Sequence, residues 1–546
     1  MLEQKKPNFL KGAAILAATG VFAKIIGAIY QIPILNVLGD EGAGYFHVTY
    51  MVYGLLLAIS TAGVPVALSR LISSAAAQGN TSLVNRYYVV AMPALTVIGI
   101  IVMCAMFLFA DGLATLMGSS QAATGIRVLA PAVFFVCIIS VYRGYAQGFQ
   151  NMVPTATSQI VEVFSKAVFG ITVALYLAGM GYQAQYVSAG AITGVTIGLG
   201  LCIPILIWYK RKIDRTGMQE DTSSASIAGA QEELPSRKRT LMRFLKISFT
   251  ISLSASFMSI MGVIDTAVVS NRLQSALFLT ESGAMAQLGI LRKGLSIFNL
   301  PPSLIVPLAV SIIPAIAAAV ARGNKNEASA ITQTSVKLTN LFAMPACAGI
   351  LVLAGPILMA LYGDSRQTPE TVLAILAAAS YFVCFQHLTI AILQAHGYER
   401  VALFTFPVGA AVRILLSYFL VANPNIGIIG SPIATLTCFI IIVTLNILVI
   451  KIKVKENLKV ISCFIKPLIC AAVMAAIAYL TYAAVHYLGA GIIGTGRTAT
   501  IIYLAIAILA GILVYIALII FARVINKDDL SHIPKGEKLT KILRVR

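Results

Sequence analysis

The stretch VYRGYAQGFQNMVPTATSQIVEVFSKAVFG (residues 141–170) joins two apolar segments through a turn that contains Gly and Pro. Its second apolar segment carries Glu162 and Lys166, four residues apart. At this spacing, with the acid first, the two side chains lie on one face of a helix and can form an ion pair. The stretch therefore predicts two consecutive helices joined by a tight hairpin, with charge inside the second helix.

Apolar segments of about 20 residues, long enough to cross a membrane, recur on both sides of this hairpin. Hydrophobic residues make up 59% of the chain and charged residues 11%, against roughly 25% charged in a soluble domain. We expect an all-α integral membrane protein, because lipid leaves each segment to satisfy its own backbone groups. The segments predict about 14 transmembrane helices, near residues 11–37, 45–73, 84–110, 122–148, 155–178, 184–209, 241–272, 283–320, 332–362, 368–395, 400–422, 427–450, 463–487 and 498–525.

Charge outside these segments predicts the orientation of the chain. The 40 Lys and Arg residues outnumber the 20 Asp and Glu residues, and the basic residues cluster after every second span. This distribution follows the positive-inside rule and places both termini in the cytoplasm of a cell bounded by this membrane. It does not form a basic stripe interleaved with aromatics, so we expect no nucleic-acid partner. The eight Cys and five His residues are dispersed and predict no metal site.

The chain reads as two similar halves. AQGN (residues 77–80) follows the second expected helix, and ARGN (residues 321–324) follows the eighth. A polar stretch rich in small residues separates the halves and predicts a flexible linker. The expected domains are an N-terminal six-helix lobe at 1–209, a cytoplasmic linker at 210–240, a C-terminal six-helix lobe at 241–455, and two further helices with a basic cytoplasmic tail at 456–546.

A second match between the halves concerns charge. Gln147 precedes Lys166 by 19 residues, and Gln394 precedes Arg413 by the same separation. This places a cation at the same depth of the fifth and eleventh helices. Parallel repeats of this kind form a substrate site near the middle of the membrane, between the halves.

Charged residues within the spans define the candidate site. Each costs at least about 2.5–3.5 kcal/mol at the centre of a span, so it is expected to face a protein interior or a wet cavity. The charged residues singled out within the spans are five cations and two anions, which predicts a cavity suited to an anionic ligand. The residues are Lys24, Lys166, Arg292, Lys293 and Arg413 as cavity cations, and Glu162 and Asp265 as acids.

The same residues also allow simpler interpretations. Glu162 and Lys166 can serve as a structural pair alone, and Lys24 can extend its amine towards the interface. Arg292 and Lys293 lie near an expected helix start and can act as interfacial anchors. Asp265 can pair with a cation or bind a coupling ion, and the sequence leaves both open.

Two segments have the composition of a gate. Pro301 and Pro302 lie in the eighth expected helix and favour a break or a bend, which can serve as a gate or be a kink alone. In the hairpin, Arg143 marks the cytoplasmic side, Gln147 precedes the turn, and Pro154 starts the next helix, where its missing donor costs least. The hairpin is either a tight connection or a contact for the substrate head group.

The sequence RGYAQGFQNMVPTATSQIVE (residues 143–162) resembles a signature of the polysaccharide-transporter and stage V sporulation protein B group. This group belongs to the multidrug/oligosaccharidyl-lipid/polysaccharide exporter superfamily and includes lipid II flippases of the MurJ and YtgP type. FLKGAAILAATGVFAKIIG (residues 9–27) is similar to its first helix, and GVPVALSRLISSAAAQGN (residues 63–80) to its second helix and following loop. Because residues 55–63 lack the cavity arginine of the Gram-negative flippases, the resemblance favours the Gram-positive, YtgP-like branch.

The resemblance implies two six-helix lobes that open alternately to the two sides of the cytoplasmic membrane. It implies a transporter that flips an undecaprenyl-pyrophosphate-linked oligosaccharide, with lipid II as the first candidate. We do not expect an enzyme such as a polyprenyl-sugar transferase, because no expected loop offers paired carboxylates with a basic partner or a His and carboxylate constellation. It also implies cavity cations on the first and eighth helices, which fall on Lys24 and on Arg292 or Lys293. The alternatives are export of another lipid-linked polysaccharide unit and cation-coupled multidrug antiport.

The expected partners are the lipid-linked oligosaccharide and the membrane lipids, with cell-wall synthesis enzymes as candidates. We expect a monomer without a cofactor. Coupling to the membrane potential or to a monovalent ion stays open.

Overall fold

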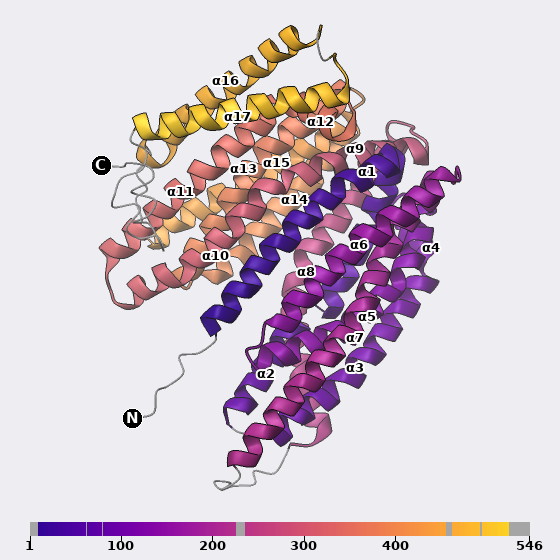
Figure 1. Ribbon diagram of the computed structural model, residues 1–546, viewed down its shortest axis with the longest axis vertical. Helices are drawn as coiled ribbons and strands as arrows, with labels where there is room; N and C mark the ends of the chain where they lie inside the picture. The colour runs from indigo at the N-terminus through magenta and orange to yellow at the C-terminus, as the bar shows by residue number, and fades with distance from the viewer. Residues whose placement is uncertain are drawn as a thin grey trace. The chain divides into compact units, whose positions relative to one another are not determined.

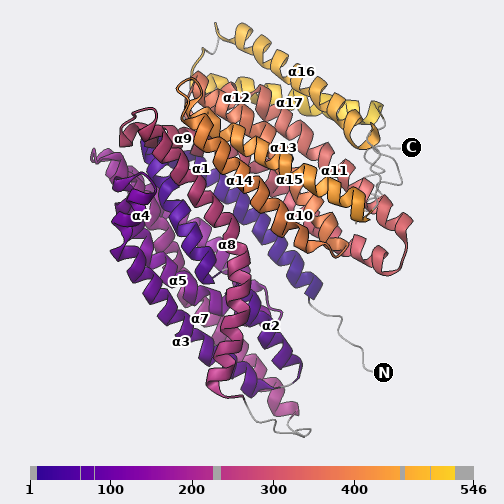
Figure 2. The same cartoon turned by 180° about the vertical axis from the view of Figure 1, so that it is seen from behind.

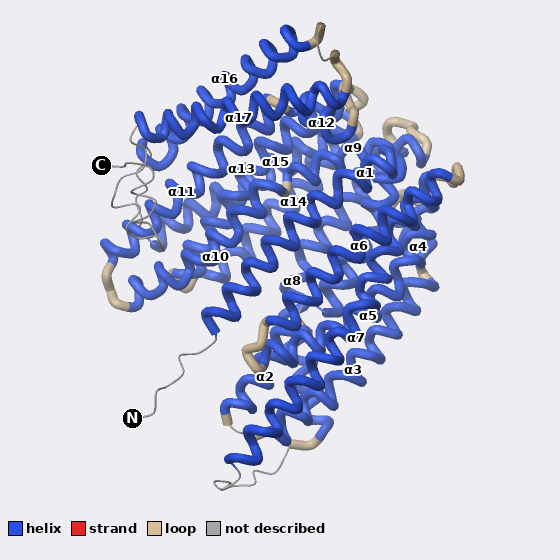
Figure 3. The backbone as a smooth tube through the Cα atoms, in the orientation of Figure 1, coloured by secondary structure: helices blue, strands red, loops and turns tan. Residues whose placement is uncertain are grey.

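The computed structural model describes residues 9–61, 63–78, 80–224, 235–454, 461–491 and 494–522. These residues form helices joined by short turns and loops (Figure 3). Eleven of the described helical segments are long and apolar enough to cross a membrane. The all-α membrane fold predicted from the sequence is therefore confirmed, whereas the number of fourteen spans stays a prediction.

The chain divides into two compact units, Met1–Gly289 and Ile290–Arg546, and the division falls within α9 (Glu281–Phe298). The other helices of the first unit, coloured indigo to magenta in Figure 1, are α1 (Phe9–Thr61), α2 (Val64–Ala77), α3 (Thr81–Leu108), α4 (Ala110–Leu116), η1 (Ser120–Ala122), α5 (Ala123–Gly148), α6 (Val153–Gly179), α7 (Ala184–Ser224) and α8 (Arg237–Ser275). The unit extends beyond the expected first lobe because α8 packs against α1, α2 and α3. The division into six-helix lobes stays a prediction.

The second unit begins within α9, and its helices α13 and α15 lie side by side in both views (Figures 1 and 2). Its helices are α10 (Leu300–Ala321), α11 (Lys325–Val352), α12 (Ala354–Tyr362), α13 (Gln367–Ala395), η2 (Glu399–Val401), α14 (Ala402–Val421), η3 (Gly427–Ile429), α15 (Gly430–Val449), η4 (Ile450–Val454), η5 (Ile461–Ile465), α16 (Lys466–Gly489) and α17 (Arg497–Phe521).

The two halves repeat a local structure where the sequence repeats. Asn80 caps α3 by accepting a hydrogen bond from the backbone N–H of Leu83, and Asn324 caps α11 in the same way from Glu327. Both helices are 28 residues long, and a short helix, α4 or α12, follows each. An Asn side chain at this position satisfies a backbone donor that the first turn leaves without a helical partner. The AQGN and ARGN segments are therefore equivalent helix starts.

Glycine allows α6 and α7 of the first unit to pack closely against each other. A Cβ atom added to Gly194 would lie 2.4 Å from the backbone nitrogen of Gly170, and one added to Gly198 would lie 3.1 Å from the carbonyl oxygen of Glu162. Small residues allow membrane helices to approach this closely. This contact fixes the part of the α6 backbone that carries Glu162 and Lys166.

Two breaks interrupt the helices of the first unit. Gly39 adopts a left-handed backbone, with φ of 64°, and separates two expected spans inside the continuous α1. The second break lies at Gly63, whose N–H donates to Ser252 Oγ of α8 at 2.9 Å. A Cβ at Gly63 would lie 2.2 Å from the carbonyl oxygen of Ser248, so only glycine fits against α8 here.

The expected eighth helix is broken in the structure. α9 ends at Phe298, and α10 begins at Leu300 with Pro301 and Pro302 in its first turn. Prolines in the first turn of a helix remove donors that have no helical acceptor. The break predicted from these prolines is therefore present.

The expected linker is partly helical. α7 continues to Ser224, into the stretch that the sequence assigned to a flexible linker, and residues 225–234 lie outside the described residues. Lys210 and Asp214 form an ion pair of 2.7 Å one turn apart, and Tyr145 of α5 donates to Asp214 at 2.8 Å. These contacts attach α7 to α5 at Asp214.

Candidate functional site

The hairpin formed by α5 and α6 carries a polar network inside the first unit. Arg143 of α5 donates from Nε to Ser158 Oγ at 2.9 Å and forms an ion pair with Glu162 at 3.0 Å. The Arg143 side chain is 17% exposed and that of Glu162 is 32% exposed. The structure thus gives Glu162 a cation from the neighbouring helix, which the i, i+4 spacing alone did not indicate.

The turn of the hairpin is closed by hydrogen bonds. Gln147 donates from its side-chain amide to Thr155 Oγ1 at 3.2 Å, and α6 begins at Val153 with Pro154 in its first turn. Gln150 in the turn has a positive φ of 57°. These contacts are those of a tight connection, and a role of Gln147 in gating or substrate binding stays a prediction.

Lys166 lies one turn beyond Glu162 and faces the aromatic residues of α1. Its ammonium nitrogen is 4.8 Å from the ring centroid of Tyr50 and 5.4 Å from that of Tyr30. Tyrosine rings attract a cation over their faces, by about 2 kcal/mol when the contact is desolvated. The half-buried Lys166 thus packs against two tyrosine rings in the middle of a span.

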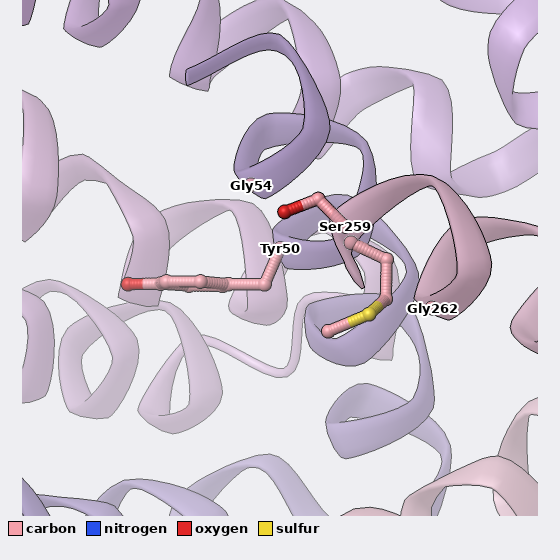
Figure 4. Close-up of a pocket in the computed structure, with 5 residues that line it drawn as sticks. Tyr50, Gly54, Ser259 and Gly262 are labelled. Carbon is pink, nitrogen blue, oxygen red and sulfur yellow. The ribbon is translucent and has the colours of Figure 1, made fainter. Parts of the chain in front are cut away.

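A cavity of about 300 Å³ lies between α1 and α8, next to this lysine. It is lined by Tyr50, Met51 and Gly54 of α1 and by Ser259 and Gly262 of α8 (Figure 4). The Tyr50 ring therefore contacts the Lys166 ammonium and also lines the cavity. Tyr50 thus lies between the Lys166 cation and the apolar cavity.

For Lys24 and Asp265, the other two candidate site residues of the first unit, the structure gives fewer described contacts. Lys24 belongs to α1, but its side chain lies outside the described residues. Asp265 lies on α8, three residues after the cavity residue Gly262, and is 3% exposed. Burial to this degree is unusual for a carboxylate and is consistent with either of its predicted roles.

Lys293 is packed inside the second unit. It is 6% exposed, and its ammonium lies 5.4 Å from the ring centroid of Tyr362 in α12. The Tyr362 hydroxyl is hydrogen-bonded to Ser296 at 2.7 Å. These contacts place Lys293 between α9 and α12, and its role as a cavity cation or an interfacial anchor stays a prediction. Arg292, the preceding residue, is half-buried.

Asp364 extends this cluster into the loop after α12. Burial alone would raise its pKa, but hydrogen bonds from the side chain and backbone of Arg366, together with the charge of Lys293, hold the pKa of Asp364 below its usual value. The Arg366 guanidinium donates to both carboxylate oxygens, at 2.9 and 2.5 Å. The carboxylate is therefore stabilised in its ionised form.

Arg413 is half-buried on α14, which packs against α15. It occupies a membrane-spanning helix, as predicted, and its role in a cavity stays a prediction.

Lys337 of α11 was missed by the sequence analysis. It is 7% exposed, within a candidate span, and one turn before the buried Asn340, which accepts from Tyr381 at 3.0 Å and donates to the Cys463 carbonyl at 2.7 Å. The signal in the sequence was the polar face around this lysine. It consists of Thr332, Ser335, Thr339 and Asn340.

Residues 9–320, more than half of the chain, match the model of the family described as polysaccharide biosynthesis protein. The chain belongs to this family. It is 26% identical over 539 residues to the uncharacterized membrane protein YabM of Bacillus subtilis, covering 98% of this chain and 97% of that protein. It is also 24% identical to stage V sporulation protein B of the same organism, over 97% of this chain and 98% of that protein. A third Bacillus subtilis relative, the lipid II flippase MurJ, is 24% identical over 75% of this chain and 77% of that protein.

Solved structures show the same fold. The lipid II flippase MurJ in an inward closed conformation matches with a TM-score of 0.68 and 17% identity, over 93% of this chain and 99% of that one. An inward-facing multidrug resistance MATE family transporter of the MOP superfamily matches with a TM-score of 0.62 and 17% identity, over 81% of this chain and 99% of that one. This member of the polysaccharide biosynthesis protein family is therefore a multi-pass helical membrane protein with the fold of that superfamily.

Proposed function

We propose that this protein is a transporter that flips an undecaprenyl-pyrophosphate-linked oligosaccharide across the cytoplasmic membrane by alternating access, with lipid II as the first substrate to test. One observation carries the proposal. Lys166 keeps a half-buried ammonium at a mid-span position, 4.8 Å from a tyrosine ring that lines an apolar cavity. A pyrophosphate attached to a polyprenyl chain combines the charge and the apolar character that these two neighbours would bind.

Family membership and the 24% identity to a lipid II flippase support this choice of substrate class. The breaks at Gly39, Gly63 and Asn299 offer positions where backbone angles can change as the transporter opens to either side. We infer that the protein acts as a monomer with both termini in the cytoplasm. Coupling to the membrane potential or to a monovalent ion is the proposed source of energy.

Another lipid-linked glycan is the second candidate. Similarity to stage V sporulation protein B over 97% of the chain favours it, as does the description of the family. Multidrug antiport is less well supported, because a pocket for cationic drugs needs free acidic groups and Glu162 is paired with Arg143.

The test is to deplete the protein and identify the lipid-linked precursor that accumulates on the inner leaflet. Accumulation of lipid II supports the first candidate, and accumulation of another polyprenyl-linked glycan supports the second. If neither accumulates while cells become sensitive to cationic drugs, the flippase proposal is wrong.

A further inference from the structure

The cavity between α1 and α8 exists because two of its wall residues lack side chains. A Cβ atom added to Gly54 would meet no heavy atom of the described residues within 4 Å, and one added to Gly262 would meet only Met51 Sδ, at 3.5 Å. By contrast, a Cβ at Gly44, earlier in α1, would lie 2.0 Å from the carbonyl oxygen of Met285. Close helix packing thus explains glycine at position 44 but does not explain it at positions 54 and 262.

The size and lining of the cavity limit what it can hold. Interiors of proteins are closely packed, and an apolar cavity of about 150 Å³ stays dry and binds a six-carbon ring. A space of about 300 Å³ lined mainly by carbon therefore suits about ten carbons, or about two isoprene units. Among the described residues that line it, Tyr50 and Ser259 carry side-chain hydroxyls.

The position of Lys166 places a positive charge beside the cavity. Its ammonium lies on the Tyr50 ring that forms one wall, so an anionic group there would be only one ring away from the apolar space. In a phospholipid, glycerol separates the phosphate from the acyl chains. In a polyprenyl pyrophosphate, the pyrophosphate is bonded directly to the first isoprene unit. The short separation between charge and cavity favours the second class of molecule.

We propose that the α1–α8 cavity holds the first isoprene units of a polyprenyl pyrophosphate while Lys166 lies beside the pyrophosphate. The assignment rests on the proposed function and adds a site for the apolar part of the substrate. Gly54 and Gly262 then determine specificity, because they provide the space for the chain. Tyr50 is the positioning residue, because its ring holds the Lys166 ammonium beside the cavity.

The test uses the purified full-length protein in detergent micelles and two probes, geranyl pyrophosphate, which has two isoprene units, and inorganic pyrophosphate. Calorimetric titration should show that the wild type binds geranyl pyrophosphate roughly tenfold or more tightly than pyrophosphate, through burial of the chain. Gly54→Leu should abolish this preference and leave pyrophosphate binding unchanged. Gly54→Ala should retain most of it, and Lys166→Ala should weaken the binding of both probes.

Two variants keep the result interpretable. Gly262→Leu fills the cavity from the opposite wall and should repeat the effect of Gly54→Leu. Gly112→Leu in α4, where an added Cβ would also meet no described heavy atom within 4 Å, is the control for size and should behave as wild type. An unchanged preference for geranyl pyrophosphate in both cavity variants would overturn the proposal. A second result would also overturn the proposal. In it, the wild type binds geranyl pyrophosphate no more tightly than pyrophosphate, but binds phosphatidylglycerol, and both cavity variants abolish the binding of phosphatidylglycerol.

The experiments distinguish a wrong cavity assignment from a wrong proposed function. If the cavity variants lose the preference but depleted cells accumulate no lipid-linked precursor, the cavity assignment stands and the proposed function is wrong. If a precursor accumulates but the cavity variants keep their preference, the proposed function stands and the cavity assignment is wrong.

Discussion

Arg143 and Glu162 join the two arms of the 141–170 hairpin through an ion pair of 3.0 Å, although 19 residues separate them in the chain. Arg143 also donates to Ser158, so the guanidinium contacts two successive turns of α6. Because both side chains are largely withdrawn from solvent, removing one partner leaves the other charge poorly compensated. The pair should therefore stabilise the packing of α5 on α6.

Arg143→Ala should lower the free energy of unfolding by about 1–3 kcal/mol, the usual cost of leaving a buried polar partner unsatisfied. Glu162→Ala should cost a similar amount and should destabilise the protein more than it impairs transport. Chemical unfolding in mixed micelles measures both. In the double variant the two effects should be non-additive by about 0.5 kcal/mol or more. Strict additivity would show that the pair contributes nothing.

Gly194→Ala should disrupt the contact between α6 and α7. The added methyl group would lie 2.4 Å from the backbone nitrogen of Gly170, and neither backbone can yield without separating the helices. Overpacking of this kind costs about 1–3 kcal/mol. Gly179→Ala, at the end of α6, is the matched control, because its Cβ would meet no described heavy atom within 4 Å. Equal melting temperatures for the two variants would contradict the packing described for Gly194.

Asp364 should make stability depend on acid pH. Its pKa in the folded protein lies below the value of about 3.9 of an unfolded Asp, so its stabilisation is complete above that value and is lost as the pH falls through the folded pKa. Asp364→Asn should lower the melting temperature at pH 7, and the difference from wild type should shrink as the pH falls below about 4. Arg366→Ala should reduce the same pH dependence. A difference that stays constant from pH 7 to pH 3 would exclude this role.

The topology predicts that Ser224 is cytoplasmic and that Asn423, after α14, faces outwards. Single cysteines at the two positions, in a chain that lacks the eight native cysteines, can be labelled in intact cells with an impermeant reagent. Asn423→Cys should react, and Ser224→Cys should react only after the cells are opened. The reverse pattern would invert the orientation derived from the positive-inside rule.

The helices could be located from the sequence because their signal is local. The apolar segments, the helix-starting Pro154 and the break before Pro301 all depend on neighbours in the chain. The attachment of α7 to α5 could not be predicted, because the contact between Tyr145 and Asp214 joins two helices that are distant in the chain. A polar composition alone indicated a linker there.

The site was predicted less completely, because the environment of a charge is set by other helices. The sequence identified Lys166 but could not show that Tyr30 and Tyr50 of α1 lie under its ammonium. It left open whether Lys293 is a cavity cation or an interfacial anchor, and it could not show that the Tyr362 ring and Asp364 lie beside its ammonium. A charged residue in an apolar segment can thus be predicted from the sequence to be buried, but its contacts depend on how the helices pack.

The last prediction concerns the cations Lys24, Lys166 and Arg413. Charge at these depths is costly, and binding of a pyrophosphate is the simplest reason to retain it. Each change to Ala should leave the protein inserted and should lower transport by roughly tenfold or more, the size of one lost charge-assisted contact. Lys24→Arg should keep partial activity, because it preserves the charge and changes the geometry. Transport is measured as complementation of a flippase-depleted strain at equal protein level.

Lys293→Ala is the comparison for the Ala variants of Lys24, Lys166 and Arg413, because it separates a loss of stability from a loss of transport. If Lys293 is an anchor, its loss should lower the melting temperature through the contacts with Tyr362 and Asp364, and transport should fall only in proportion to the folded protein. Lys166→Ala should lower transport far more than it lowers the melting temperature, because the loss of its cation–π contacts, about 0.5–2 kcal/mol, is offset by removal of a costly charge from the middle of a span. Full complementation by the Ala variants of Lys24, Lys166 and Arg413 would rule out the anionic-cavity mechanism, since no cation would then be needed to hold the substrate.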